Sequence, residues 1–231
     1  MAGTTKKIVT TVGSTLGPKL VELAPGVSAG VVQGALQRAI TGVGPLPGAA
    51  AAADKQLEEQ HGDLKKAVRE VIENHVRYAS VNGFATNIGG LVTTAVTLPA
   101  NVTGLALIEC RMVAGIAHLR GYDLDDPRVR DAILVTLLGE EKVNKQVKKH
   151  KLPAPPMAIA TAPVHDPDLD RIVAAEVTSE LLTRVAGKRL VTTVGRKVPI
   201  VGGVVGASVD GWDTYRIGRY ASRELLPRAR R

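Results

Sequence analysis

The chain has 231 residues, of which 45% are hydrophobic and 3% aromatic, with one cysteine and a formal net charge of +8. This length suffices for one sizeable core, which must be built from Val, Leu, Ile and Ala because aromatic side chains are scarce. The charge excess indicates an anionic partner, and we exclude nucleic acid because the chain has few aromatic residues for base stacking and no recognisable reader motif.

The first part of the chain predicts an N-terminal helical extension, residues 1–60. Apolar residues recur at helical spacing over residues 4–23 and again over residues 27–41. A linker rich in Gly and Pro follows over residues 42–48. Five consecutive alanines then start a third helix, residues 49–60, which has high helix propensity but little surface for packing.

The clearest helix covers residues 63–80. Its apolar residues form one stripe, with Lys, Arg and Glu on the opposite side. Asp63 is a suitable N-cap for it. His75 lies on the apolar stripe, where we interpret it as a core histidine with its hydrogen bonds satisfied.

The central stretch, residues 78–108, contains no charged residue. Such a run must be buried in protein, in lipid or in both. It predicts two apolar helices hinged at Pro99, which is well placed to start the second one, with Asn82-Gly83 and Gly121 at the outer ends. We expect an apolar pocket for lipid between them, lined by Phe84, Leu91, Leu98, Leu105, Ile108 and Met112.

The lengths of these segments argue against a full membrane span. Residues 83–98 as a helix would measure about 24 Å at ~1.5 Å per residue, shorter than a hydrocarbon core of ~30 Å. A hairpin that enters the bilayer part of the way or lies at its surface, and a hairpin buried in protein, are the alternatives. The 24 glycines of the chain favour close contact between helices.

Glu109, Arg111 and His118 interrupt the second apolar helix. Charged groups in such surroundings should be paired or functional. The favoured interpretation is a structural ion pair, with Asp210 or Arg216 as partner. The alternative is contact with a lipid headgroup or catalysis, for which Glu109 and His118 are the candidate groups.

A helix over residues 127–139 begins at a strong cap-and-proline signal, and a lysine-rich segment, residues 140–151, follows. If this segment is helical, one face carries Lys142, Lys145 and Lys149. A solvated charged face is the favoured interpretation, and contact with anionic headgroups is the alternative.

Other motifs for chemistry are missing from the sequence. There is no phosphate-binding loop, nucleophile elbow or zinc-type His/Cys spacing, and Cys110 has the apolar neighbours of an inert thiol. The acids at residues 165–170 suit the start of a helix over residues 167–187, ending at Gly187, better than a metal site. We expect neither cofactor nor metal.

The last helical segment, residues 198–226, has two unlike faces. The apolar face carries Thr214, Ile217, Gly218, Ala221 and Leu225. The opposite face carries Trp212, Tyr215, Arg216, Arg219, Tyr220 and Arg223. Aromatic rings beside arginines suit a membrane interface, and packing against another helix is the alternative. Residues 227–231 form a basic tail that we expect to be disordered.

Several of these segments together resemble the EcsC family of bacterial proteins. They are Asn82-Gly83-Phe84, Leu98-Pro99, the helix with Arg111 and His118, Gly121 to Pro127, and Lys197 to Gly203 followed by the helix from Asp210 to Ala221. The resemblance covers roughly residues 45–226, and we define residues 61–226 as the EcsC-like domain. It implies a helical, cytoplasmic, membrane-associated protein and supplies no catalytic triad or metal site.

These observations predict an all-α protein, a multi-helix bundle with Gly/Ala-rich apolar helical hairpins. We expect it to be cytoplasmic, at the inner face of the membrane, to dock on or partly insert into anionic membrane, and to bind phospholipid. One alternative is a hydrolase acting on a lipid or peptide, and another is an adaptor for a membrane transporter or other protein. The sequence leaves the lipid, the partner and the oligomeric state open.

Overall fold

The computed structural model describes the backbone over residues 29–88, 94–194 and 199–228 and the side chains over residues 30–81, 100–185 and 210–228. The helix expected over residues 4–23 lies outside these ranges. In chain order the elements are α2 (Ala29–Thr41), β1 (Gly42–Val43), β2 (Leu46–Pro47), α3 (Ala49–Glu59), α4 (Leu64–Ile88), α5 (Thr94–Leu119), α6 (Pro127–Thr136), α7 (Glu140–Lys148), α8 (Pro156–Ala160), α9 (Pro167–Val194) and α10 (Pro199–Glu224).

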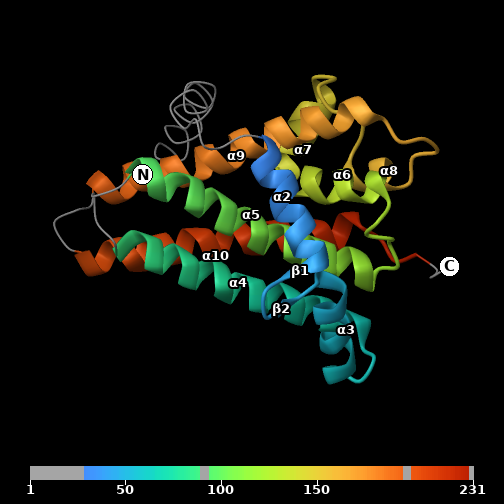
Figure 1. Ribbon diagram of the computed structural model, residues 1–231, viewed down its shortest axis with the longest axis horizontal. Helices are drawn as coiled ribbons and strands as arrows, with labels where there is room; N and C mark the ends of the chain where they lie inside the picture. The colour runs from blue at the N-terminus through green and yellow to red at the C-terminus, as the bar shows by residue number, and fades with distance from the viewer. Residues whose placement is uncertain (1–28, 89–93, 195–198, 229–231) are drawn as a thin grey trace.

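The all-α prediction is confirmed. The described strands, β1 and β2, have two residues each and form one antiparallel hairpin within the predicted linker. Four long helices, α4, α5, α9 and α10, make up the body of the bundle (Figure 1). Helix α2 crosses α5 and α9, and α3 packs on α4 and α5, so the start of the described chain joins the same core.

Helices α4 and α10 form the closest pair, and glycines make their approach possible. A Cβ on Gly211 would lie 2.4 Å from Ser80 Oγ, and one on Gly218 would lie 2.9 Å from a side-chain carbon of Ile72. Such separations are too short for real atoms. Gly218 is crowded by both Ile72 and Met112 and needs glycine, whereas the Ser80 hydroxyl can rotate away from a Cβ at Gly211. Because Gly211 lies against Ser80 and Gly218 against Ile72, the two helices run antiparallel.

Helix α5 supplies much of the core. Its predicted apolar face is confirmed for Leu105 and Met112, which are buried, whereas Ile108 is only half-buried. Among the described residues, Ala100–Leu119 is long and apolar enough to cross a bilayer, contrary to our expectation that no segment reaches that length, but it is mostly buried within the bundle. Cys110 is buried there too, and burial raises the pKa of its thiol.

Several predicted helix ends were wrong. Helix α4 continues through Asn82-Gly83, α5 begins before Pro99 rather than at it, α9 continues through Gly187, and α6 ends at Thr136. A glycine inside a helix costs about 1 kcal/mol relative to alanine. Packing against a long neighbouring helix offsets a cost of that size, so the helices extend past residues that end isolated helices.

The structure confirms the predicted capping residues at the start of α6 and the end of α5. Asp126 caps α6 by accepting a hydrogen bond from the backbone N–H of Arg128, with Pro127 at the first helical position. Gly121 follows the end of α5 with a φ of +82°, a conformation that favours glycine. In the predicted tail, Arg228 is not disordered, because its N–H bonds to the carbonyl of Arg120 and its guanidinium lies over Tyr122.

Candidate functional site

Helix α10 has the two faces that the sequence predicted. The apolar face is buried and includes Ile217, Ala221 and Leu225. On the other side, Trp212 is 62% exposed and Tyr215 is 39% exposed. Their rings are stacked with centroids 6.0 Å apart. These two aromatic side chains therefore form a preorganised apolar surface that faces solvent.

Tyr220 does not belong to that surface. It is only 4% exposed and packs in the core, and burial raises the pKa of its hydroxyl. At ~100° per residue it lies about 80° around the helix from Trp212, at the edge of the predicted face. The neighbouring helices cover this edge, which the sequence of α10 alone does not reveal.

The arginines of α10 divide into two groups. Arg216 pairs with Glu141 at 3.0 Å, and Arg223 pairs with Glu140, so both join α10 to the first turn of α7. Arg219 is exposed. Exposed pairs of this kind contribute ~0–1 kcal/mol, which leaves the arginines able to exchange their partners for anions in solution.

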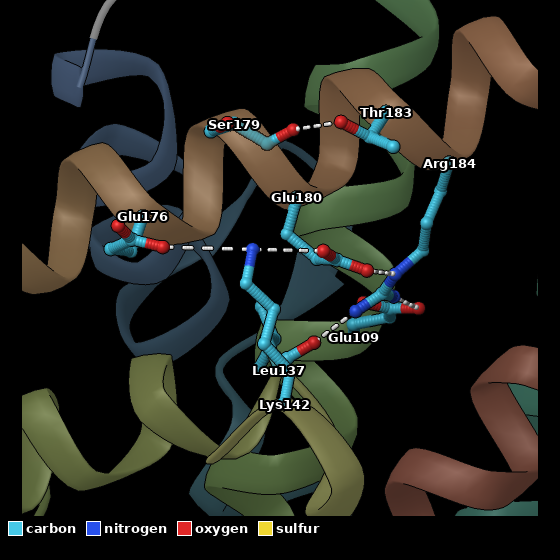
Figure 2. Close-up of polar contacts among 8 residues, drawn as sticks. All are labelled: Glu109, Leu137, Lys142, Glu176, Ser179, Glu180, Thr183 and Arg184. Carbon is cyan, nitrogen blue, oxygen red and sulfur yellow. Dashed lines mark hydrogen bonds and ion pairs between the residues drawn. The ribbon is translucent and has the colours of Figure 1, made fainter. Parts of the chain in front are cut away.

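The predicted lysine face is only partly exposed. Lys145 and Lys149 face solvent. Lys142 turns toward α9, where its Nζ lies 2.9 Å from Glu180 and 3.6 Å from Glu176 (Figure 2). It is a structural cation in this position, and the basic surface of α7 is smaller than the sequence suggested.

Glu109 forms the ion pair that we expected, but with a different partner. Its carboxylate is fully buried and accepts two bonds of 3.1 Å from Nη1 of Arg184, on α9 (Figure 2). Arg184 also bonds to Glu180 at 3.1 Å and to the carbonyl of Leu137. We name Glu109, Arg184, Glu180 and Lys142 the Glu109 cluster. Arg216, one of the two expected partners, pairs with Glu141 instead.

Opposite charges stabilise the ionised forms of Arg184 and Glu180 in the Glu109 cluster. Burial disfavours the cation of Arg184, but Glu109 and Glu180 outweigh it and raise the pKa of that guanidinium. Burial likewise tends to raise the pKa of Glu180, but Arg184 and Lys142 hold it below its usual value. Each charge is thus neutralised within the protein, as a structural role requires.

Glu109 and His118, the candidate catalytic groups, are not brought together. His118 Nε2 lies 2.8 Å from Asp54 of α3, whereas Glu109 points to α9. Nine residues of helix separate them by about 13 Å at ~1.5 Å per residue and turn them to opposite sides. Arg111, the third polar residue of this helix, donates to the carbonyl of Pro47.

The predicted apolar pocket is described only in part. Leu105 and Met112 belong to the packed core, and the sulfur of Met112 would lie 3.0 Å from a Cβ on Gly218. Ile108 is half-buried. The remaining side chains of this set lie outside the described residues, namely Phe84, Leu91 and Leu98.

A second polar cluster, which sequence reasoning missed, lies at the other end of α9. Asp166 accepts a hydrogen bond from the N–H of Asp168, which confirms its predicted capping role. His165 and Asp170, however, meet Asp131 of α6. Their possible ligand atoms lie within 4.8 Å of one another. Local spacing does not predict this meeting, because Asp131 lies in another helix, 34 residues before His165.

One of the comparisons with known proteins gives a match. The family model of the EcsC protein family matches residues 48–229, most of the chain. No curated protein and no solved structure matches it significantly.

Proposed function

The chain belongs to the EcsC protein family, and on that premise we propose that it is a peripheral membrane protein that docks on anionic phospholipid at the cytoplasmic face of the membrane. The docking surface is the exposed side of α10, with Trp212, Tyr215 and Arg219. The bundle itself stays outside the hydrocarbon core or enters it only at one end.

The exposed Trp212–Tyr215 stack carries this proposal. Large aromatic side chains are normally used to fill the core, and here the only tryptophan of the chain faces solvent. Tryptophan and tyrosine are favoured at the membrane interface, where an apolar ring and a polar edge are both accommodated. Tyr78 and Val81 of α4 are also exposed, and they lie at the same level along the α4–α10 pair.

The end of the bundle beyond this surface supports the same orientation. There α4 leads into α5 and α9 leads into α10, at the left of Figure 1. The sequence has no charged residue over residues 78–108 or over residues 198–209, whereas cations flank the second of these runs at Arg196 and Lys197. In sequence terms, uncharged runs that adjoin cations are typical of segments that insert partly into an anionic surface.

The charge of the chain supports an anionic rather than a neutral membrane. A basic residue near an anionic surface contributes about 1 kcal/mol of attraction, and the net charge is +8. This attraction is screened by salt. Binding should therefore need anionic lipid and weaken as ionic strength rises.

Vesicle binding tests the proposal. We expect co-sedimentation of the full chain with vesicles of phosphatidylglycerol and phosphatidylcholine but not of phosphatidylcholine alone, and a blue shift of Trp212 emission on the anionic vesicles. Trp212→Ala with Tyr215→Ala should weaken co-sedimentation without lowering the melting temperature. The matched control is Leu46→Ala with Val164→Ala, which truncates two exposed apolar side chains elsewhere and should bind normally.

Equal binding to neutral and anionic vesicles, or binding to neither, would contradict the proposal. So would normal binding by the variant with Trp212→Ala and Tyr215→Ala, or emission from Trp212 of the unchanged chain that anionic vesicles do not shift. Binding that appears only when vesicles contain a membrane transporter would favour the adaptor alternative instead.

A further inference from the structure

Asp131, His165 and Asp170 form a compact set of side chains, which we name the Asp131 cluster. Asp131 lies in the middle of α6, His165 two residues before α9, and Asp170 in the first turn of α9. Nε2 of His165 lies 2.8 Å from Oδ1 of Asp170 and 3.4 Å from Oδ2 of Asp131. One imidazole nitrogen therefore faces two carboxylates at once.

Asp131 holds a buried oxygen atom that has no hydrogen-bond partner among the described residues. The residue is only 3% exposed, and the atom is its Oδ2. A cation stabilises a carboxylate buried in this position, and the nitrogen that faces it, Nε2 of His165, lies closer to Asp170 than to Asp131.

The other charged groups nearby do not supply that cation. Arg128, one turn before Asp131, is held by the carboxylate of Asp126 and by the carbonyl of Ala162. Asp126 adds negative charge on the same side. The hydrogen bond with Arg128 has the largest effect in lowering the pKa of the Asp126 carboxyl, and His165 lies close enough to lower it further.

We propose that Asp131, His165 and Asp170 bind a divalent metal ion of the Zn²⁺ type. Tetrahedral ligands at ~2.0–2.1 Å from zinc lie about 3.4 Å apart, and the separation of Asp131 and His165 already has this value. The separation of His165 and Asp170 needs to lengthen from 2.8 Å to about 3.4 Å. No two of the ligand atoms are more than 4.8 Å apart.

The ligand types select the class of metal. An imidazole nitrogen favours Zn²⁺ and similar transition metals, whereas Mg²⁺ and Ca²⁺ favour sites built from oxygen alone. His165 and Asp170 are partly exposed, so the ion can enter from solvent and keep a water as its fourth ligand. Bound there, it joins α6 to the start of α9.

Metal binding to the full, tag-free chain after treatment with chelator tests the proposal. Titration calorimetry should give one Zn²⁺ per chain in the micromolar range or tighter, and the melting temperature should rise with Zn²⁺ concentration. Mg²⁺ should give neither effect. Asp131→Asn and His165→Gln should each weaken Zn²⁺ binding by more than the roughly 10–100-fold that loss of an outer-shell partner costs.

His118→Gln is the matched control, because His118 also contacts an aspartate at 2.8 Å but without a second acid. It should bind Zn²⁺ as the unchanged chain does. Failure to bind Zn²⁺ in the micromolar range overturns the proposal, as does binding that both Asp131→Asn and His165→Gln retain. Asp131→Asn mimics the protonated acid and should fold, and if it does not, the partly exposed His165→Gln decides the question.

Discussion

The Glu109 cluster and the Asp131 cluster both bury a carboxylate against α9, but the two carboxylates differ in the number of cationic side chains around them. Glu109 meets Arg184, which in turn meets Glu180, and Lys142 completes the set. Asp131 meets one histidine that it shares with a second acid. Where the chain supplies its own cations, a buried acid can serve structure alone; where it does not, the acid takes up a proton or a metal.

The largest effect should follow from breaking the balanced cluster. Arg184→Met should lower the free energy of unfolding by about 3–5 kcal/mol, because it leaves Glu109 buried without its cation. Glu109→Gln should cost less, about 1–3 kcal/mol, because an amide is left poorly paired rather than charged. Chemical denaturation of both variants measures these losses.

The double variant Glu109→Gln with Arg184→Met is the control for that experiment. It removes both charges and should recover part of the loss caused by Arg184→Met alone. An additive loss, or a loss below about 1 kcal/mol for Arg184→Met, would show that the pair is not a buried structural pair.

In the Asp131 cluster, removing the acid should stabilise the protein. The folded pKa of Asp131 is about 7, above the ordinary value of 3.8, so the folded state binds more protons than the unfolded state between these values and stability falls as pH rises through them. His165, whose pKa is raised first by Asp170, adds a loss of the same sign as pH rises above its ordinary 6.5.

In the presence of chelator, Asp131→Asn should therefore raise the free energy of unfolding at pH 7.5 by about 1–3 kcal/mol. This is part of what a shift from 3.8 to about 7 provides at ~1.4 kcal/mol per pKa unit. Its advantage should shrink at pH 5, where the native acid is already protonated. Denaturation at the two pH values measures this. A variant less stable than the unchanged chain at pH 7.5 would mean that the carboxylate is well paired.

His75 extends the comparison of the two clusters, because it is a buried histidine that forms no ion pair with a carboxylate among the described residues. It is buried in α4, its Nδ1 lies 2.7 Å from the carbonyl of Val71, and its Nε2 has no hydrogen-bond partner among the described residues, so our expectation of satisfied hydrogen bonds was only half right. Burial lowers its pKa from 6.5 to about 4, against the effect of the Val71 carbonyl.

A lowered folded pKa means that the unfolded state binds more protons between pH 4 and 6.5, so stability is lost as pH falls through this window. The loss from His75 between pH 7 and pH 5 should be about 2 kcal/mol at ~1.4 kcal/mol per unit, opposite in sign to that from Asp131. In His75→Leu, denaturation should show this part of the pH dependence missing. An unchanged pH profile would mean that the pKa of His75 does not differ between the folded and unfolded states.

The sequence alone determined the all-α class, the order of the longer helices and most of their buried faces, but not the short helix α8. Ile217, Ala221 and Leu225 are buried on α10 as their spacing predicts, and Asp126 caps α6 as predicted. These features depend on residues within one or two turns of each other, where helical periodicity and capping chemistry act. The helix ends at Asn82-Gly83 and Gly187 were missed because packing between helices outweighs a local weakness.

Only the tertiary structure decided which charges meet. Arg184 lies 75 residues from Glu109 along the chain, and Asp131 stands in a different helix from His165 and Asp170. Their residue types show that each needs a partner, because an unpaired buried charge is costly. No local spacing says which partner is near, since that depends on how α5, α6, α7 and α9 pack together. The same packing turned Lys142 and Tyr220 inward and left Trp212 and Tyr215 facing solvent.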